Sequence, residues 1–159
     1  MTRYLMALLG GCALCASLIG WPVAVGAATA RVDDTGTRVS TPLVGMRWRQ
    51  LVPGRGADNT AEGSVQVALR LNVQPWLNQR GRIYMTLAPA ARADAIKATW
   101  RTQGRLLPGS VQSGGRAVIF DGTIAAASIE ETIDLTLSAD GRSLVSPQSL
   151  QFAFEIETP

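Results

Sequence analysis

A large apolar side chain occupies every second position of residues 64–73, whose sequence is Ser-Val-Gln-Val-Ala-Leu-Arg-Leu-Asn-Val. Successive side chains of a β-strand point to opposite faces of its sheet. This period therefore predicts a strand with one face in a core and the other toward solvent. Pro75 ends the segment, because proline cannot donate a backbone hydrogen bond to a sheet. The inward face would carry Val65, Val67, Leu69, Leu71 and Val73.

Two later segments, residues 132–138 and 150–156, repeat this alternation of apolar and mostly polar side chains. We therefore predict that they pack with the first strand in facing sheets. The side chains expected to be buried there are Leu69, Leu71, Leu135, Leu137, Phe152 and Phe154. Shorter strands are expected at residues 46–51, 82–87, 99–107 and 117–120, with a return strand that starts at residues 143–145.

Short strands separated by turn signals indicate an all-β fold. One such signal is residues 139–142, Ala-Asp-Gly-Arg, in which the glycine can adopt a positive φ. We predict a single domain, residues 46–159, folded as an antiparallel β-sandwich of the immunoglobulin-like kind. A small β-barrel is the alternative, because closing one sheet and packing two sheets leave the same local pattern. One short helix is expected at residues 89–98, which begin with Pro89 and are rich in alanine.

Residues 1–30 have the organisation of a secretory signal peptide. Arg3 supplies a basic start, and residues 4–18 form an almost unbroken apolar run without charge. Small residues then surround the expected cleavage positions. Cleavage fits best after Ala30 and second best after Ala27, so we expect an exported chain that is periplasmic or at the cell surface and is free of the membrane after cleavage.

Two other interpretations of this N-terminus remain open. The apolar stretch from Tyr4 to Ala30 is long enough to span a bilayer, so an uncleaved anchor is one alternative. The other is a lipoprotein signal that ends at Cys12, after Leu9-Gly10-Gly11. Glycines and a small-residue cleavage position favour a cleaved signal over an anchor, and the apolar segment before Cys12 is very short for a lipoprotein.

Residues 31–45 are mostly polar and are predicted to form an extended N-terminal arm. Within this arm, Val39, Thr41 and Leu43 share one parity, as residues of a strand offered to a partner would. Because the arm carries few large apolar groups, we expect it to be poorly ordered in an isolated monomer. The last predicted strand, residues 150–156, is apolar on one face and is suited to pair along an open sheet edge.

The composition excludes several classes of chemistry. The chain contains no histidine, and its only cysteines, Cys12 and Cys15, lie in the expected signal peptide. The mature chain therefore lacks the usual ligands of zinc, copper, haem and iron–sulfur sites, and we expect no metal, cofactor or disulfide. Removal of Arg3 lowers the formal net charge from +3 (15 basic and 12 acidic side chains) to +2. No cluster of basic residues indicates binding to nucleic acid or to an anionic membrane.

The densest acidic group consists of Glu130, Glu131 and Asp134. A carboxylate acts on a sugar when an opposing acid faces it across a cleft, and the sequence supplies no such acid. We interpret the group as the solvated beginning of a strand. Asp121 and Asp140 each precede a glycine and are interpreted as turn residues, because no loop carries enough oxygen ligands for calcium.

Aromatic and cationic side chains supply the candidate binding residues. Arg82 and Tyr84 share one strand parity, and Trp48 lies between two arginines. Trp76 follows a proline beside a turn, where a bulky side chain is difficult to bury. We predict that these four side chains, Trp76, Trp48, Tyr84 and Arg82, contact a saccharide or a peptide.

In organisation, an exported β-sandwich behind an extended arm is similar to a fimbrial subunit of the chaperone–usher kind. The disulfide common in such subunits is missing and no family motif is present, so the sequence identifies no family. We expect a non-enzymatic protein that binds other proteins at the cell envelope, as a structural or accessory subunit of a surface appendage or secretion apparatus. Self-association through edge strands is one form of such binding. The alternative is an extracytoplasmic carbohydrate- or peptide-binding module.

Overall fold

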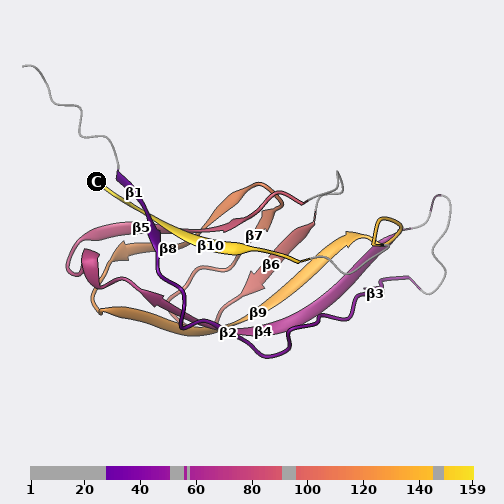
Figure 1. Cartoon of the computed structure of the whole chain (residues 1–159), viewed down its shortest axis with the longest axis horizontal. Coiled ribbons are helices and arrows are strands. Elements are labelled where there is room, and N and C mark those ends of the chain that lie inside the picture. Colours follow the sequence, from indigo (N-terminus) through magenta and orange to yellow (C-terminus); the bar gives the residue numbers. More distant parts are fainter. Residues whose placement is uncertain (1–27, 51–55, 57, 91–95, 145–148) are drawn as a thin grey trace, which may run out of the picture.

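Two antiparallel sheets pack face to face in this protein (Figure 1). The structure is a computed structural model that describes residues 28–50, 56, 58–90, 96–144 and 149–159. No helix within these ranges is long and apolar enough to cross a membrane. The predicted all-β sandwich is confirmed, and the barrel alternative is wrong because the sheets have open edges.

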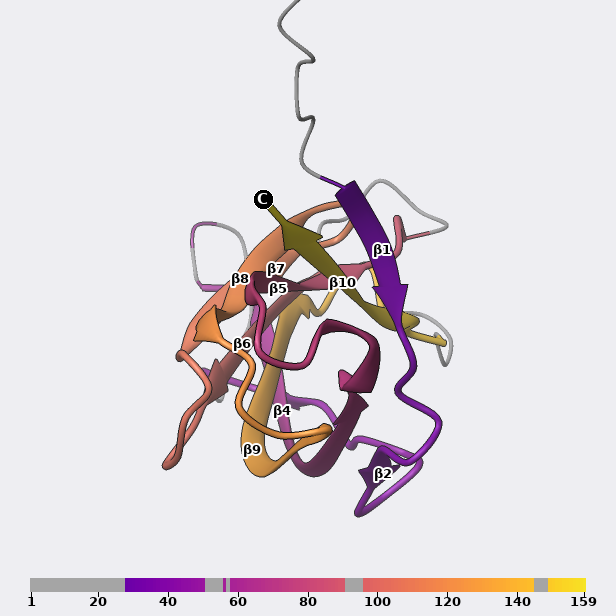
Figure 2. The ribbon, with the colours of Figure 1, turned by 90° about the vertical axis from the view of Figure 1, so that its left-hand side faces the viewer.

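Sheet A contains four strands in the order β1-β10-β5-β8. These are β1 (Ala28–Val32), β10 (Phe152–Thr158), β5 (Arg80–Leu87) and β8 (Arg116–Thr123). Sheet B has the order β2-β4-β9-β6-β7, and β3 also pairs with β4. Its strands are β2 (Arg38–Val39), β3 (Arg47–Trp48), β4 (Thr60–Asn72), β9 (Ser128–Asp140), β6 (Lys97–Arg101) and β7 (Gly109–Gln112). A 3₁₀ turn, η1 (Gln74–Trp76), follows β4, and Figure 2 shows β1 and β10 on the side of the molecule away from β4 and β9.

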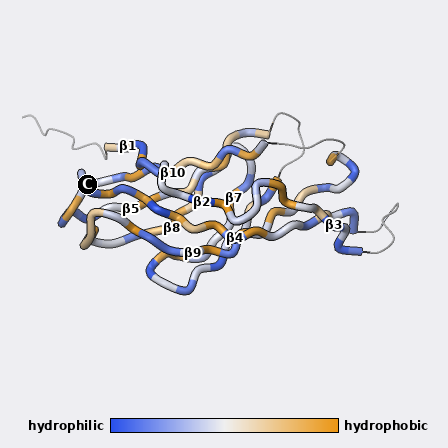
Figure 3. Tube along the Cα trace, turned by 60° about the horizontal axis from the view of Figure 1, so that its bottom comes forward, coloured by the Kyte–Doolittle hydropathy of each residue, from blue (hydrophilic) through white to orange (hydrophobic). Residues whose placement is uncertain are grey.

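The antiparallel pair of β4 and β9 is the longest element of the fold. Both strands are 13 residues long, and they pair continuously from Thr60 opposite Asp140 to Asn72 opposite Ser128. Exposure alternates residue by residue along β4, and the hydropathy of the chain alternates with it (Figure 3). The alternation predicted for residues 64–73 is therefore confirmed, and its apolar face lies in the core.

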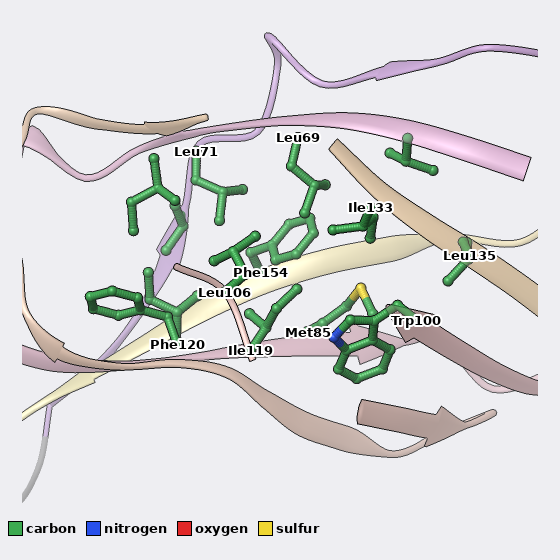
Figure 4. Packing of buried hydrophobic residues seen from close by; sticks show 14 of the residues in the cluster. Leu69, Leu71, Met85, Trp100, Leu106, Ile119, Phe120, Ile133, Leu135 and Phe154 are labelled. Atoms are coloured by element: carbon green, nitrogen blue, oxygen red, sulfur yellow. The ribbon is translucent and has the colours of Figure 1, made fainter. Parts of the chain in front are cut away.

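The core lies between the two sheets (Figure 4). Five of the six side chains predicted to be buried are buried, and Phe152 is partly buried at one end of β10. Trp100 of β6 is 1% exposed, and its indole Nε1 donates a hydrogen bond to the carbonyl oxygen of Leu107 at 2.7 Å. The only polar atom of that large side chain is thereby satisfied, so the whole ring contributes to packing.

The helix predicted at residues 89–98 is wrong at its C-terminal end, and residues 91–95 lie outside the described ranges. Lys97 and Ala98 belong to β6, where Ala98 lies between Leu137 of β9 and Val111 of β7 and is fully buried. Pairing with two neighbouring strands outweighs the intrinsic preference of alanine for helix.

Other strand boundaries also differ from the prediction. The strand expected at residues 99–107 ends at Arg101, and a turn begins there. The return strand expected from residue 143 is absent at residues 143 and 144, because the backbone N–H of Ser143 donates to the carbonyl of Asp140 at 3.0 Å and closes a turn. The strand expected at residues 46–51 is reduced to β3, with its last residue outside the described ranges.

The N-terminal arm is part of the sandwich, and the expectation of a poorly ordered arm is wrong for its paired residues. All five residues of β1 pair with β10, and Val32 is fully buried. The backbone N–H of Asn72 donates to the carbonyl of Asp33 at 2.9 Å, so the chain crosses from sheet A to sheet B directly after β1. It then pairs through β2 with β4. The sequence missed β1 because only its last side chain is large and apolar.

We expect Leu71→Ala to lower the free energy of unfolding by about 2–5 kcal/mol, because Leu71 is fully buried and its truncation leaves a cavity. The matched control is Thr132→Ala on the exposed face of the neighbouring strand, which should change stability by less than about 0.5 kcal/mol. Urea unfolding followed by tryptophan fluorescence measures both. Equal losses would contradict the assignment of the two faces.

Candidate functional site: an apolar groove between the sheets

A cavity of about 620 Å³ lies between the inner faces of the two sheets. We call it the interior groove. Its floor is the apolar face of β4 and β9, and the described residues of that floor are Val65, Val67, Leu69, Ile133, Leu135, Leu137 and Ala139. The opposite wall comes from sheet A and the segments beside it, through Met85, Leu150, Phe152 and Phe154. Figure 4 shows Leu69 and Ile133 directed from sheet B toward Phe154 and Met85 of sheet A.

The rim of the groove is the arm segment of residues 39–46. Val39, Thr41 and Leu43, which the sequence singled out as partner-strand residues, all line the groove. Val39 is 52% exposed and Leu43 is 77% exposed. These three residues therefore lie together at the mouth of the protein's own groove.

Contacts with β4 hold this rim in place. The backbone N–H of Ser40 donates to the carbonyl of Gln66 at 3.0 Å. Further along the arm, Val44 and Met46 pack directly over Gly63, where a β-carbon would lie 2.7 Å from Val44 and 2.8 Å from the Met46 sulfur. Glycine is required at this position, because any side chain would displace the rim from the strand.

An incompletely paired strand edge borders the same groove. β1 ends at Val32, which is opposite Phe154. Among the described strands, Phe152 and Ala153 of β10 pair with β5 on one side and with no strand on the other. Phe152 lines the groove, so apolar side chains and an open backbone edge occur at one place. Such an edge can accept an added strand.

The chemistry of the groove is that of apolar burial. Its lining is mostly aliphatic and aromatic, and Asp34 is the one charged residue among the described lining residues. Thr37, also in the lining, uses its hydroxyl oxygen to accept a hydrogen bond from the backbone N–H of Arg70 at 3.1 Å. A lining of this kind holds apolar side chains and offers no acid–base pair for catalysis.

The four predicted aromatic and cationic binding residues do not form one platform. Trp48 pairs with the first part of β4 through β3, whereas Trp76 lies in η1 just after the end of β4. A strand of 13 residues separates these positions by about 40 Å. Trp76 is partly buried and packs against the core, and the Trp48 ring covers Gly141, where a β-carbon would lie 2.5 Å from it.

Arg82 and Tyr84 lie next to each other on the outer face of sheet A, in a network of charges. Arg82 donates to Asp121 at 3.0 Å, and the Tyr84 hydroxyl donates to Glu157 at 2.9 Å. Arg116 also donates to Glu157, at 2.7 Å, and its guanidinium lies 4.4 Å from the centre of the Tyr84 ring. Hydrogen bonds from Arg116 and then Tyr84 lower the pKa of Glu157. These side chains already have partners within the sheet.

The acidic residues have separate structural roles. Glu131 accepts hydrogen bonds from the backbone N–H groups of Gly104, Arg105 and Leu106 at 2.9, 2.8 and 3.0 Å, which closes the turn after β6. Glu130 forms an exposed ion pair with Arg70 at 3.1 Å. The interpretation of an acidic, mostly solvated beginning of a strand holds for Glu130 but misses the turn-closing role of Glu131, which only the folded chain reveals.

Comparison with known proteins does not identify a function for this chain, so the candidate site is assigned from the structure. The sequence matches no protein-family model and no curated protein. Within the described ranges, no group of three or more acidic side chains is placed to hold a metal ion. The interior groove is therefore the candidate functional site, and no signal in the sequence predicted it beyond the parity of Val39, Thr41 and Leu43.

We expect Glu131→Ala to destabilise the protein by about 1–3 kcal/mol, because three backbone donors would lose a charged acceptor. The matched control, Glu130→Ala, removes an exposed ion pair with Arg70 and an exposed hydrogen bond from the Ser128 hydroxyl, and should cost about 0–1 kcal/mol. Chemical unfolding of both variants measures the difference. A loss from Glu130→Ala as large as that from Glu131→Ala would contradict the turn-closing role.

Acid should destabilise the folded state below the ordinary pKa of its carboxyl groups. Hydrogen bonds from Arg142 lower the pKa of Asp140 from 3.8 to about 2, and bonds from Thr60 lower the pKa of Asp58. A lowered folded-state pKa stabilises the fold above the unfolded value and loses this effect as pH falls through the folded value. We expect the thermal midpoint to fall between pH 4 and pH 2, and to fall less in Asp140→Asn. An unchanged midpoint over that range would contradict the linkage.

Proposed function

We propose that this chain is an exported, non-enzymatic protein that binds another protein at the cell envelope, as a subunit of a surface appendage or a secretion apparatus. The interior groove receives an extended apolar segment of that partner. The carrying observation is the coincidence of a 620 Å³ apolar cavity with exposed Val39 and Leu43 on its rim.

The spacing of the side chains along the groove floor suits a single extended segment. Along the floor, Val65, Val67 and Leu69 recur at every second residue, which is the spacing at which a strand presents side chains to one face. The open edge at Phe152 and Ala153 supplies backbone groups for the same segment.

Burial of the apolar rim residues supplies the driving force for binding of the partner segment. Full burial of a valine or leucine side chain is favourable by about 1.5–3 kcal/mol, and both rim residues are largely exposed in the free protein. A partner that covers Val39 and Leu43 and fills the groove also removes an exposed apolar surface from water. The groove carries almost no charge, so the partner segment is uncharged where it enters.

Export is supported by residues 1–30, which have the basic start, apolar run and small-residue ending of a secretory signal. The proposal of a non-enzymatic protein is supported by the absence of histidine from the chain. The alternative, a carbohydrate-binding module, receives less support, because Trp48 and Trp76 lie at opposite ends of β4.

Photo-crosslinking in the native envelope tests the proposal. A photoreactive residue at Leu43 should give a discrete protein adduct, whereas the same residue at Thr132, on the exposed face of β9, should not. Mass spectrometry should map the crosslink to an uncharged partner segment with apolar residues at alternate positions.

Two variants that each add one carboxylate, one at the rim and one away from it, provide the matched comparison. Val39→Asp should reduce the Leu43 adduct about tenfold or more, because docking would then bury an unpaired carboxylate. Thr99→Asp adds the same charge on the outer face of sheet B and should leave the adduct unchanged. An adduct with lipid alone, or equal loss from the two variants, would contradict binding of a protein segment in the groove.

A further inference from the structure

We propose that residues 38–46 act as a strap that opens to admit the partner segment into the interior groove and then closes over it. This inference rests on the proposed function, because it concerns how that same groove is filled. The strap consists of β2 and the residues between β2 and β3, and Figure 1 shows it running along β4. Its residues that line the groove are Val39, Thr41, Pro42, Leu43, Val44 and Met46.

The strand register shows that the strap is longer than the edge it covers. β2 ends opposite Val67 of β4, and β3 begins opposite Glu62. The seven residues 40–46 of the strap therefore lie opposite only four residues of β4, 63–66. The three extra residues bow away from the edge of β4, and Leu43 in this part is 77% exposed.

Few contacts hold the strap on β4. The strand β2 has only two residues, and both are exposed. The backbone N–H of Ser40 donates to the carbonyl of Gln66 at 3.0 Å, but residues 41–46 make no backbone hydrogen bond to any described residue. An exposed segment with few hydrogen bonds opens at a lower free energy than the whole domain needs to unfold. The strap is therefore the part of the groove that opens most easily.

The end of the strap at β3 is held more firmly than the end at β2. The Trp48 ring covers Gly141, and Arg49 forms ion pairs with Asp58 and Glu62. The backbone N–H of Arg49 also donates to the carbonyl of the first residue of β4 at 2.9 Å. The strap therefore lifts at β2 and pivots at β3, while the two sheets stay intact.

This motion solves the problem of entry into the groove. An extended segment with apolar side chains at alternate positions must enter sideways, because several side chains pass the rim together. Val39 and Leu43 line the mouth of the groove and stand in that path. After entry, closure packs the same two side chains on the segment and removes their surface from water. The segment thereby stabilises the strap that closes over it.

A disulfide that joins β2 to β4 tests the strap. Arg38→Cys and Ala68→Cys place two cysteines at exposed residues that lie directly opposite each other, at a separation that a disulfide spans. A photoreactive phenylalanine analogue at Phe152, which lines the groove, reports entry of the partner segment. The purified full chain is oxidised and then mixed with envelopes from cells that lack it. We expect the oxidised pair to give about tenfold less Phe152 adduct than the reduced pair.

The control is the chain that carries the same analogue at Phe152 without the two cysteine substitutions. It should give the same adduct after oxidation as after reduction. Equal adducts from the oxidised and reduced pair would overturn the strap while leaving binding in the groove intact. No adduct from the control chain in either state would overturn the proposed function, and with it this inference.

Hydrogen exchange of the free protein tests opening without a partner. The Ser40 amide should exchange about tenfold or more faster than the amide of Ile133, which lies in the long pair of β4 and β9. Oxidation of the cysteine pair should slow the exchange of Ser40 and reduce this difference. If Ser40 and Ile133 exchange at one rate in the reduced protein, the strap opens only when the whole domain unfolds, and the proposal is wrong.

Discussion

The pairing of β4 with β9 sets the dimensions to which the rest of the structure conforms. Thirteen residues give each strand a length of about 43 Å, whereas the eight residues of β5 span about 26 Å. Both long strands are apolar on one face except at Glu131 of β9, which lies on that face and accepts hydrogen bonds from the turn after β6. Sheet A is too short to cover that face, so other parts of the chain must cover what remains.

The N-terminal arm supplies part of this cover. It starts as β1 at the edge of sheet A, crosses at Asp33 to sheet B, and continues along the edge of β4 to β3. Val44 and Met46 lie over Gly63 on the way, so the apolar face is closed there by direct contact. The described residues leave the space between this cover and β10 unfilled, and the interior groove is the result.

The outer faces are organised differently from the interior. Arginine and carboxylate side chains pair across neighbouring strands, as in Arg82 with Asp121 and Arg116 with Glu157. Each exposed pair contributes little to stability, but together they leave few charged groups on that face of sheet A available to a ligand. Two of the five exposed large apolar side chains of the described residues, Val39 and Leu43, lie at the groove, which is why the proposed partner is an apolar segment.

The sequence alone determined the strands with a clear period of two and the burial of Leu71, Ile133 and Phe154, because alternation depends only on local strand geometry. It also placed Val39, Thr41 and Leu43 on one parity. Only the tertiary structure decided that β1 belongs to sheet A, that Ala98 lies in a strand, and that Glu131 closes a turn. The groove was decided there too, since it depends on the unequal lengths of strands that are far apart in the sequence. Pairing partners and the space between sheets are long-range properties, and no local pattern of residues encodes them.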